Sequence, residues 1–408
     1  MTYLKSIEAA ITSDQLDAFA RLRVSEPYTV FDSKQIHDSQ ALFWDDQETS
    51  GSGTSSSHGA NTASTTIGVG TTTAGVRVRQ TFIRFNYQPG KSQLIFATFV
   101  LDKSGGGTGI TRRVGYFDDD NGLFLEDAEG TYGVGVRTFS SGSAVDTVVA
   151  QASWNIDPLD GTGPSGMVID FTKAQILIID FEWLGVGAVR FGFMIDGVIH
   201  YVHQVNNANN LSQVYMSTPN LPVRYEIEND GTGAASTLEH ICSSVVSEGG
   251  RQDTGTLHYA STSGTHVDAN AANTVYAIVG IRLKSGQLDS TVDLARTSII
   301  DQTGGDFEWL LILNPTVAGT FTYGDVANSA AQTATGATAN TVTGGTVLDG
   351  GFIAGASGSA SAGAVAVLQS AIRLGSAIDG TPDEIVLCAR PLGTNQDIEG
   401  SITWREAR

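Results

Sequence analysis

The alternation of apolar and polar positions along the chain predicts short β-strands separated by glycine-rich turns. Residues 77–87 alternate between the two kinds of side chain, which is typical of a half-buried strand. Residues 94–101 and 176–181 are continuous apolar runs and indicate buried, central strands. Further strand-like runs follow at 277–283, 307–313, 365–374 and 384–390. The pattern therefore predicts an all-β protein.

Two hairpins are predicted from turn signals. Asp196-Gly197 between apolar runs predicts a two-residue turn over 189–203, and Asn121-Gly122 predicts another over 114–126, because these residues tolerate positive φ. A two-residue turn fixes the register. The cross-strand pairs expected in the first hairpin are Ile195–Val198, Phe193–His200, Phe191–Val202, Met194–Ile199 and Arg190–His203. The face with the phenylalanines should lie in the core, with His200 toward it.

Three segments depart from the strand pattern. Residues 7–23 are the best helix candidate, because their apolar side chains fall near one stripe. Residues 47–75 form a polar tract that is poor in large apolar side chains, which predicts an extended loop or arm. Residues 327–363 are rich in Ala, Gly, Ser and Thr and predict a second low-complexity loop.

Chain length and these segments predict the domain organisation. The 408 residues suggest two to three domains at roughly 100–200 residues each. The polar segment 248–255 is the expected boundary. We expect an N-terminal helix or arm over 1–27, a jelly-roll or lectin-like β-sandwich over 28–250, and a smaller β-sandwich over 251–408.

Charge and cysteine content exclude several classes of function. The net charge is −20, from 23 basic and 43 acidic residues, so the chain should repel nucleic acid and anionic membranes. Its beginning lacks a basic segment followed by an apolar stretch, so no signal peptide is expected. No run of about 18 apolar residues occurs, so no membrane insertion is expected. Cys242 and Cys388 lie in or beside apolar runs and are expected as core thiols.

Motifs that bind nucleotides or metals are weak in this sequence. The segment 161–166 matches GxGxxG, but a strand, not a helix, is expected after it, which disagrees with a dinucleotide site. His200 and His203 are three residues apart, so on a strand their rings should point to opposite faces and cannot share a metal. The acidic turn 118–122 lacks the ligand spacing of an EF-hand. His37 is a candidate for a polar network, with a structural loop histidine as the alternative.

Catalytic motifs are no stronger. No serine has glycine at both minus two and plus two, so there is no nucleophile elbow. Asp180 with Glu182, or Asp45 with Asp46, could form a glycosidase pair, but such pairs have little specificity in an acidic chain. Trp183 and Trp309 lie within apolar runs and are expected to pack in cores. We therefore expect no catalytic, cofactor-binding or metal-binding residues, no cofactor, and a protein that is not an enzyme.

Three blocks of the sequence resemble uncharacterised virion structural proteins of tailed bacteriophages, many of them from aquatic bacteria. The blocks are 21–46 with FDSKQIHD, 154–166 with DGTGPSG, and 176–250 with NLPVRYEI and CSSVVSEGG. The resemblance covers about residues 20–250 and is weaker beyond 257. It implies membership of a virus particle, made in the host cytoplasm, and supplies no catalytic residues. The order of Glu182, Trp183 and the following hairpin also resembles lectin-like jelly rolls, which is an analogy of fold alone.

The resemblance leaves two roles open. The first is a capsid-associated decoration or fibre-like protein, and the alternative is a tail, baseplate or adsorption protein with glycan-binding loops. Virion proteins act in many symmetric copies, so we expect a homo-oligomer, a trimer before a dimer, in contact with other capsid or tail proteins. Host-surface glycans are further candidate partners.

Overall fold

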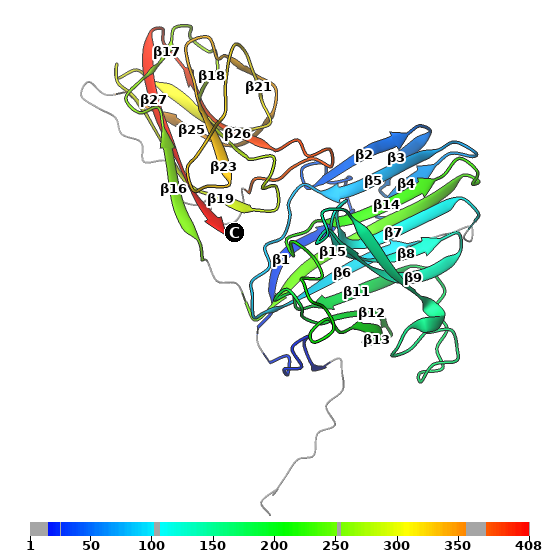
Figure 1. The fold of residues 1–408 in the computed structure, drawn as a ribbon. Helices are drawn as coiled ribbons and strands as arrows, with labels where there is room; N and C mark the ends of the chain where they lie inside the picture. Colours follow the sequence, from blue (N-terminus) through cyan, green and yellow to red (C-terminus); the bar gives the residue numbers. More distant parts are fainter. Residues whose placement is uncertain (1–14, 25, 102–106, 251–253, 356–372, 408) are drawn as a thin grey trace, which may run out of the picture. The chain divides into compact units, whose positions relative to one another are not determined.

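The computed structural model describes residues 15–24, 26–101, 107–250, 254–355 and 373–407 (Figure 1). The chain divides into two compact units, Met1–Gln252 and Asp253–Arg408. This division falls inside the predicted boundary segment 248–255. The described residues contain many strands, the short 3-10 helix η2 (Gln151–Ser153) and no α-helix, which confirms the all-β class. No helix among them is long and apolar enough to cross a bilayer.

Unit 1 is an antiparallel β-sandwich of two large sheets (Figure 1). The eight-stranded sheet has the order β13-β12-β11-β6-β15-β4-β3, with β1 paired to β15. Its strands are β1 (Tyr28–Lys34), β3 (Thr54–Gly59), β4 (Ser64–Val69), β6 (Ser92–Val100), β11 (Gln175–Phe181), β12 (Val189–Ile195), β13 (Val198–Val205) and β15 (Ser236–Glu248). The seven-stranded sheet has the order β10-β9-β8-β7-β14-β5-β2. Its strands are β2 (Trp44–Gly51), β5 (Gly75–Thr81), β7 (Ile110–Phe117), β8 (Gly122–Ala128), β9 (Thr131–Thr138), β10 (Val145–Ala150) and β14 (Val223–Asn229).

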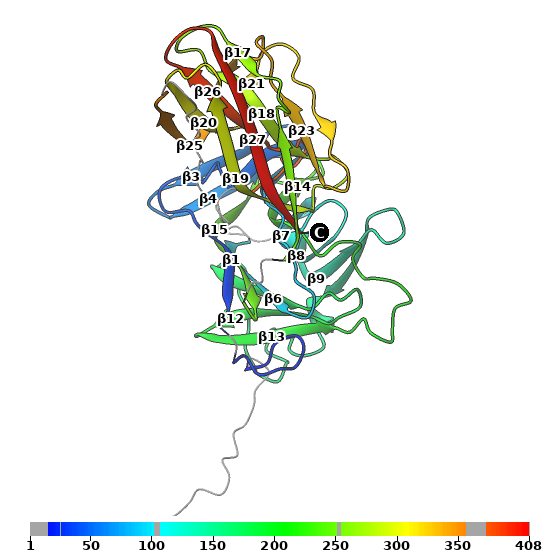
Figure 2. The ribbon, with the colours of Figure 1, turned by 90° about the vertical axis from the view of Figure 1, so that its left-hand side faces the viewer.

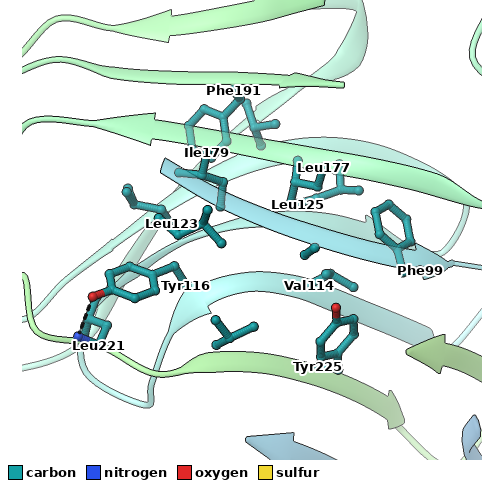
Figure 3. Packing of buried hydrophobic residues seen from close by; sticks show 14 of the residues in the cluster. Phe99, Val114, Tyr116, Leu123, Leu125, Leu177, Ile179, Phe191, Leu221 and Tyr225 are labelled. Atoms are coloured by element: carbon teal, nitrogen blue, oxygen red, sulfur yellow. Dashed lines mark hydrogen bonds between the residues drawn. The ribbon is translucent and has the colours of Figure 1, made fainter. Parts of the chain in front are cut away.

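The core of unit 1 lies between the inner faces of these sheets (Figure 3). Alternate residues of each strand point inward, as Leu177 and Ile179 of β11 do, and both are fully buried. Each such side chain contributes roughly 1.5–3 kcal/mol by leaving water. The Tyr116 hydroxyl in this core accepts the amide of Leu221 at 3.1 Å (Figure 3). Its polar atom is therefore satisfied, which removes the cost of burying it.

The 189–203 hairpin forms as predicted near its turn and differs further away. Asp196 and Gly197 have φ of 52° and 79°, and Ile195–Val198, Phe193–His200 and Met194–Ile199 pair as expected. A β-bulge then shifts the register, so Phe191 faces His203 instead of Val202, and Arg190 faces Gln204. Because Phe191 and Phe193 share a face, the bulge also brings His200 and His203 to one face. The expectation of opposite faces is therefore wrong.

The predicted Asn121-Gly122 turn is also longer than expected. Phe117 pairs with Gly122, so the turn consists of 118–121 and Gly122 begins β8. The Asp118 carboxylate accepts the amides of Asp120 and Asn121 at 3.0 and 2.9 Å. These bonds favour the four-residue turn over the two-residue one.

The polar tract 47–75 is not a loop, which corrects the prediction. It contains most of β2, the whole of β3 and β4, and the start of β5. Its polar side chains find partners inside the sandwich: Ser64 donates to Glu239 at 2.5 Å and Thr65 to Gln35 at 3.1 Å. Threonine is β-branched and suits a strand. Once the hydroxyls are hydrogen-bonded, large apolar side chains are not required for burial.

The predicted helix over 7–23 is not seen where the chain is described. Residues 7–14 lie outside the described residues, and 15–23 form a turn closed by a Leu16–Leu22 bridge. Asp17 stabilises the turn, because its carboxylate accepts the amides of Phe19 and Arg21 at 3.0 and 2.9 Å. An aspartate that bonds nearby amides competes with helix formation.

Unit 2 is a smaller β-sandwich with its own core. One sheet has the order β16-β27-β17, with β19 paired to β27, and Figure 2 shows β27 running along it. These strands are β16 (Thr256–Ser261), β17 (Val267–Ala269), β19 (Thr291–Asp301) and β27 (Gln396–Ala407). The other sheet, in the order β22-β23-β18-β26-β20-β25, contains β18 (Tyr276–Leu283), β20 (Phe307–Leu313), β22 (Gly324–Asp325), β23 (Ala331–Thr335), β25 (Thr346–Ile353) and β26 (Glu384–Pro391). A separate pair is formed by β21 (Thr316–Val317) and β24 (Val342–Thr343).

The low-complexity tract 327–363 contains β23, β24 and β25, so the prediction of a loop is wrong for its described part. The remaining residues, 356–363, lie outside the described residues, as does most of the predicted strand 365–374. Small side chains suit this position, because Ala330, Ala331 and Ala334 are buried at 0%, 0% and 3% exposure. A close-packed core accepts alanine where the neighbouring sheet approaches.

Candidate functional site

A cavity of unit 1 lies at one edge of the sandwich. Its lining comes from β9 and β10 of the seven-stranded sheet, from β13 of the eight-stranded sheet, and from the segment 206–215. β10 and β13 are edge strands of their sheets. The cavity, called the edge cavity below, has a volume of about 420 Å³, within the roughly 300–1,000 Å³ of small-molecule sites.

The lining of the edge cavity combines apolar side chains, called the floor below, with polar side chains, called the rim. The floor is formed by Val134, Val136, Val149, Val205, Leu211, Val214 and Tyr215. The rim holds hydroxyl and amide side chains, namely Thr138, Ser140, Thr147, Gln204, Asn206, Asn207 and Gln213. Apolar lining with a few convergent polar groups is the usual composition of a ligand site.

His203 lines the edge cavity, and its hydrogen bond decides which ring nitrogen is protonated. Its Nδ1 accepts the main-chain amide of Asn155 at 3.2 Å. Burial lowers the pKa of His203, so the ring is neutral at pH 7. A neutral imidazole has one proton, and an accepting Nδ1 assigns that proton to Nε2.

A side-chain bridge joins the two loops of the rim. Gln213 Nε2 donates to Ser140 Oγ at 2.8 Å, and Ser140 Oγ lies 3.0 Å from Thr138 Oγ1. Asn207 is held differently, because its amide donates to the carbonyl of Gly187 at 2.7 Å and is buried. Gln213 is therefore an exposed amide of the rim, whereas the buried Asn207 fixes the course of the loop.

The GxGxxG segment is arranged around a carboxylate. Asp157 accepts the amide of Ser165 at 2.8 Å, and its Oδ1 lies 2.1 Å from where a Cβ of Gly163 would stand. Burial by itself raises the pKa of Asp157, but its hydrogen bonds outweigh burial and lower it. An ionised carboxylate occupies the loop that a phosphate would need, which disagrees with anion binding.

The two proposed carboxylate pairs are engaged elsewhere. Asp180 accepts Arg23 and Arg190 at 2.5 Å each. Glu182 accepts the amide of Ala188 at 3.1 Å, and burial raises its pKa. Asp46 pairs with arginines inside the sandwich, and Asp45 accepts the side chain of Gln47 at 2.7 Å.

Another pair of carboxylates, which sequence reasoning did not single out, lies on the outer face of the seven-stranded sheet. Arg113 donates to Glu126 at 2.7 Å and to Glu226 at 2.8 Å. Burial by itself raises the pKa of Glu226, but Arg224 and Arg113 outweigh it and lower the pKa to about 2. Glu226 is therefore ionised at neutral pH and is a poor proton donor. The general acid of a glycosidase needs a raised pKa.

The remaining candidate residues either form contacts that stabilise the fold or are exposed to solvent. The acidic turn is held by arginines, with Asp119 2.7 Å from Arg224 and Asp118 3.5 Å from Arg84. His37 is exposed. Trp183 and Trp309 pack against the cores of unit 1 and unit 2, as expected. Cys388 is fully buried, whereas Cys242 is half-buried, and both thiols are free.

Comparisons with known proteins return similarities of structure only. No family model and no curated protein matches the chain. A protein of unknown function from Shewanella oneidensis MR-1 is 10% identical, with a TM-score of 0.35 over 61% of this chain and 100% of its own. A legume lectin-like domain from Entamoeba histolytica is 10% identical, with a TM-score of 0.32 over 53% of this chain and 96% of its own.

An endo-1,3-beta-glucanase from Streptomyces sioyaensis is also similar, at 10% identity and a TM-score of 0.35, over 59% of this chain and 99% of its own. At these identities and TM-scores, the similarities say nothing about activity or ligand.

Proposed function

We propose that this protein is a structural protein of a tailed-phage virion that binds carbohydrate through the edge cavity. The observation that supports carbohydrate binding best is the combination of apolar side chains with side-chain amides and hydroxyls in the lining of one cavity of about 420 Å³. Membership of the virion is supported by the resemblance of residues 20–250 to virion structural proteins.

The chemistry of the edge cavity suits a sugar. Each sugar hydroxyl both donates and accepts, and a side-chain amide offers a donor and an acceptor from one planar group. Gln204 and Gln213 supply such amides at the rim, and the Nε2–H of His203 supplies a further donor. The valines of the floor offer an apolar surface for the C–H groups of the ring.

This cavity favours the adsorption role over the decoration role. A decoration protein requires only a surface that contacts the shell, whereas an adsorption protein must also recognise a host-surface glycan. Many symmetric copies would raise the avidity of a weak site. A homo-oligomer, with a trimer before a dimer, is therefore part of the proposal.

A glycan array probed with the full-length protein tests carbohydrate binding. Val136→Phe should fill the floor of the edge cavity, and Gln213→Ala should remove the rim amide. Both should weaken binding of the selected glycan by about tenfold or more. Gln47→Ala is the matched control, because Gln47 is a partly exposed amide on β2, at the opposite edge of the same sheet. Absence of any bound glycan, or equal binding by all variants, would contradict the proposal.

Immunogold electron microscopy of purified particles tests membership of the virion. Gold at the tail would support the adsorption role, and gold over the head would support decoration instead. Purified particles that lack the protein by immunoblotting after denaturation would contradict membership. The array result does not depend on this experiment, so the two parts of the proposal fail separately.

A further inference from the structure

A mixed cluster of one histidine and two aspartates lies on the outer face of the four-stranded sheet of unit 2. Asp268 of β17 and Asp397 of β27 are direct cross-strand partners in an antiparallel register. Val267, Ala269 and Ile398 point into the core and are fully buried, so the two aspartates point outward by alternation. Like charges directly opposite each other destabilise a strand pair. A positive charge beside the two aspartates would therefore stabilise this strand pair.

His266 supplies the third group of the cluster. It lies two residues before Asp268, which places it on the same side of the strand. Its Nε2 lies 3.0 Å from Asp268 Oδ1 and 3.8 Å from Asp397 Oδ1. The three ligand atoms all lie within 4.8 Å of one another. Bonds of roughly 2.0–2.2 Å to a single ion require ligand atoms about 3–3.5 Å apart, so only a small closure of exposed side chains is needed.

Neighbouring residues orient the two carboxylates. Thr338 donates to Asp268 Oδ2 at 3.2 Å, which leaves Oδ1 directed at His266. The main-chain amide of Asp397 donates to Asp301 at 3.1 Å, which fixes the backbone at the other ligand. Outer hydrogen bonds of this kind hold metal ligands in place.

We propose that His266, Asp268 and Asp397 bind a divalent transition-metal ion, with Zn²⁺ first and Mn²⁺ second. One imidazole nitrogen with two carboxylate oxygens suits such ions better than Ca²⁺ or Mg²⁺, which prefer all-oxygen sites. Three protein ligands leave further positions for water, because the side chains of His266 and Asp268 are 40% and 51% exposed. The ion would link β17 to β27 and neutralise the opposed carboxylates.

Titration calorimetry of the full-length protein with ZnCl₂ and MnCl₂ tests this site, with CaCl₂ and MgCl₂ for comparison. We expect one Zn²⁺ whose affinity falls at least about tenfold in both His266→Gln and Asp397→Asn. His37→Gln is the matched control for unspecific binding by an exposed imidazole, and it should bind like the parent. Zn²⁺ should also raise the unfolding temperature of unit 2 in the parent and not in the two variants.

The alternative is an ion pair in which protonated His266 alone neutralises the aspartates. No Zn²⁺ or Mn²⁺ binding by the parent would favour that alternative and overturn the proposal. Zn²⁺ binding that persists unchanged in both variants would overturn it as well, because the ion would then lie elsewhere.

Discussion

Asn155 and His203 are joined along the edge of unit 1 by one hydrogen bond, and Asn155 also bonds to the neighbouring Gln204. The amide of Asn155 donates to His203 Nδ1 at 3.2 Å, and its side chain exchanges bonds of 2.8 and 2.9 Å with the main chain of Gln204. One asparagine thus pairs with the free edge of β13 and sets the tautomer of a cavity residue. Edge strands have unpaired main-chain groups that such a side chain can satisfy.

We predict that Asn155→Ala destabilises unit 1 by about 1 kcal/mol, because two hydrogen bonds to Gln204 are lost in a partly exposed position. Urea unfolding followed by fluorescence measures the change. Asn206→Ala is the control, since its side chain only accepts a surface bond from Gln204 at 2.6 Å, and its effect should stay within about 0.5 kcal/mol. Equal stability of Asn155→Ala and the parent would contradict the pairing.

Asp180→Asn should be among the most destabilising single changes in unit 1. The fully buried Asp180 accepts Arg23, Arg190 and Tyr201 at 2.5, 2.5 and 2.8 Å. Loss of its charge removes the carboxylate that Arg23 and Arg190 share, although Arg23 keeps its ion pair with Glu248 at 2.6 Å, at a cost of roughly 3–5 kcal/mol. Chemical denaturation gives the value. Asp146→Asn breaks a more exposed pair with Arg137 and should cost about 1 kcal/mol or less. Similar costs for both variants would refute this reasoning.

Glu226 should make the stability of unit 1 depend on acidic pH. Its folded pKa is lowered to about 2 from 4.5, so the unfolded chain binds the proton more tightly. Its contribution is complete above the unfolded pKa and is lost as pH falls through the folded pKa. The stability difference between parent and Glu226→Gln should therefore be constant above about pH 5 and shrink by about 3 kcal/mol toward pH 2. Unfolding curves at several pH values measure this, and a difference independent of pH would contradict the prediction.

Thiol labelling should distinguish the reactivities of the two cysteines. Burial raises the pKa of the Cys388 thiol far above its usual value, and that of Cys242 to a lesser extent. Since the thiolate is the reactive form, Cys388 should react with a disulfide reagent only when unit 2 unfolds. Cys242→Ala should abolish slow labelling of the native protein, and Cys388→Ala should leave it unchanged. Rapid native labelling of Cys242→Ala would show that Cys388 is accessible.

Local sequence patterns determined the fold class of this protein and many of its strands. The continuous apolar runs at 94–101 and 176–181 correspond to β6 and β11, because a buried strand needs apolar side chains on both faces. Asp196-Gly197 fixed its turn, because few residue pairs accept positive φ at both positions. Each of these features depends on neighbours in the chain, which is why composition and periodicity sufficed.

Contacts between distant residues were decided by the tertiary structure alone. The 47–75 tract forms strands because Gln35 and Glu239 accept hydrogen bonds from its hydroxyl groups inside the sandwich. The bulge in β13 reversed the relation of His200 and His203, since one extra residue inverts the alternation of a strand.

Both candidate sites likewise depend on contacts between distant parts of the chain. The edge cavity needs β9, β10 and β13 from two different sheets, and the Asp268–Asp397 pair needs the register of β17 on β27. The sequence alone determined the all-β class and the Asp196-Gly197 turn, because these depend on local periodicity and on backbone conformation. Only the tertiary structure decided which polar side chains meet, because strand pairing joins residues that no local pattern relates.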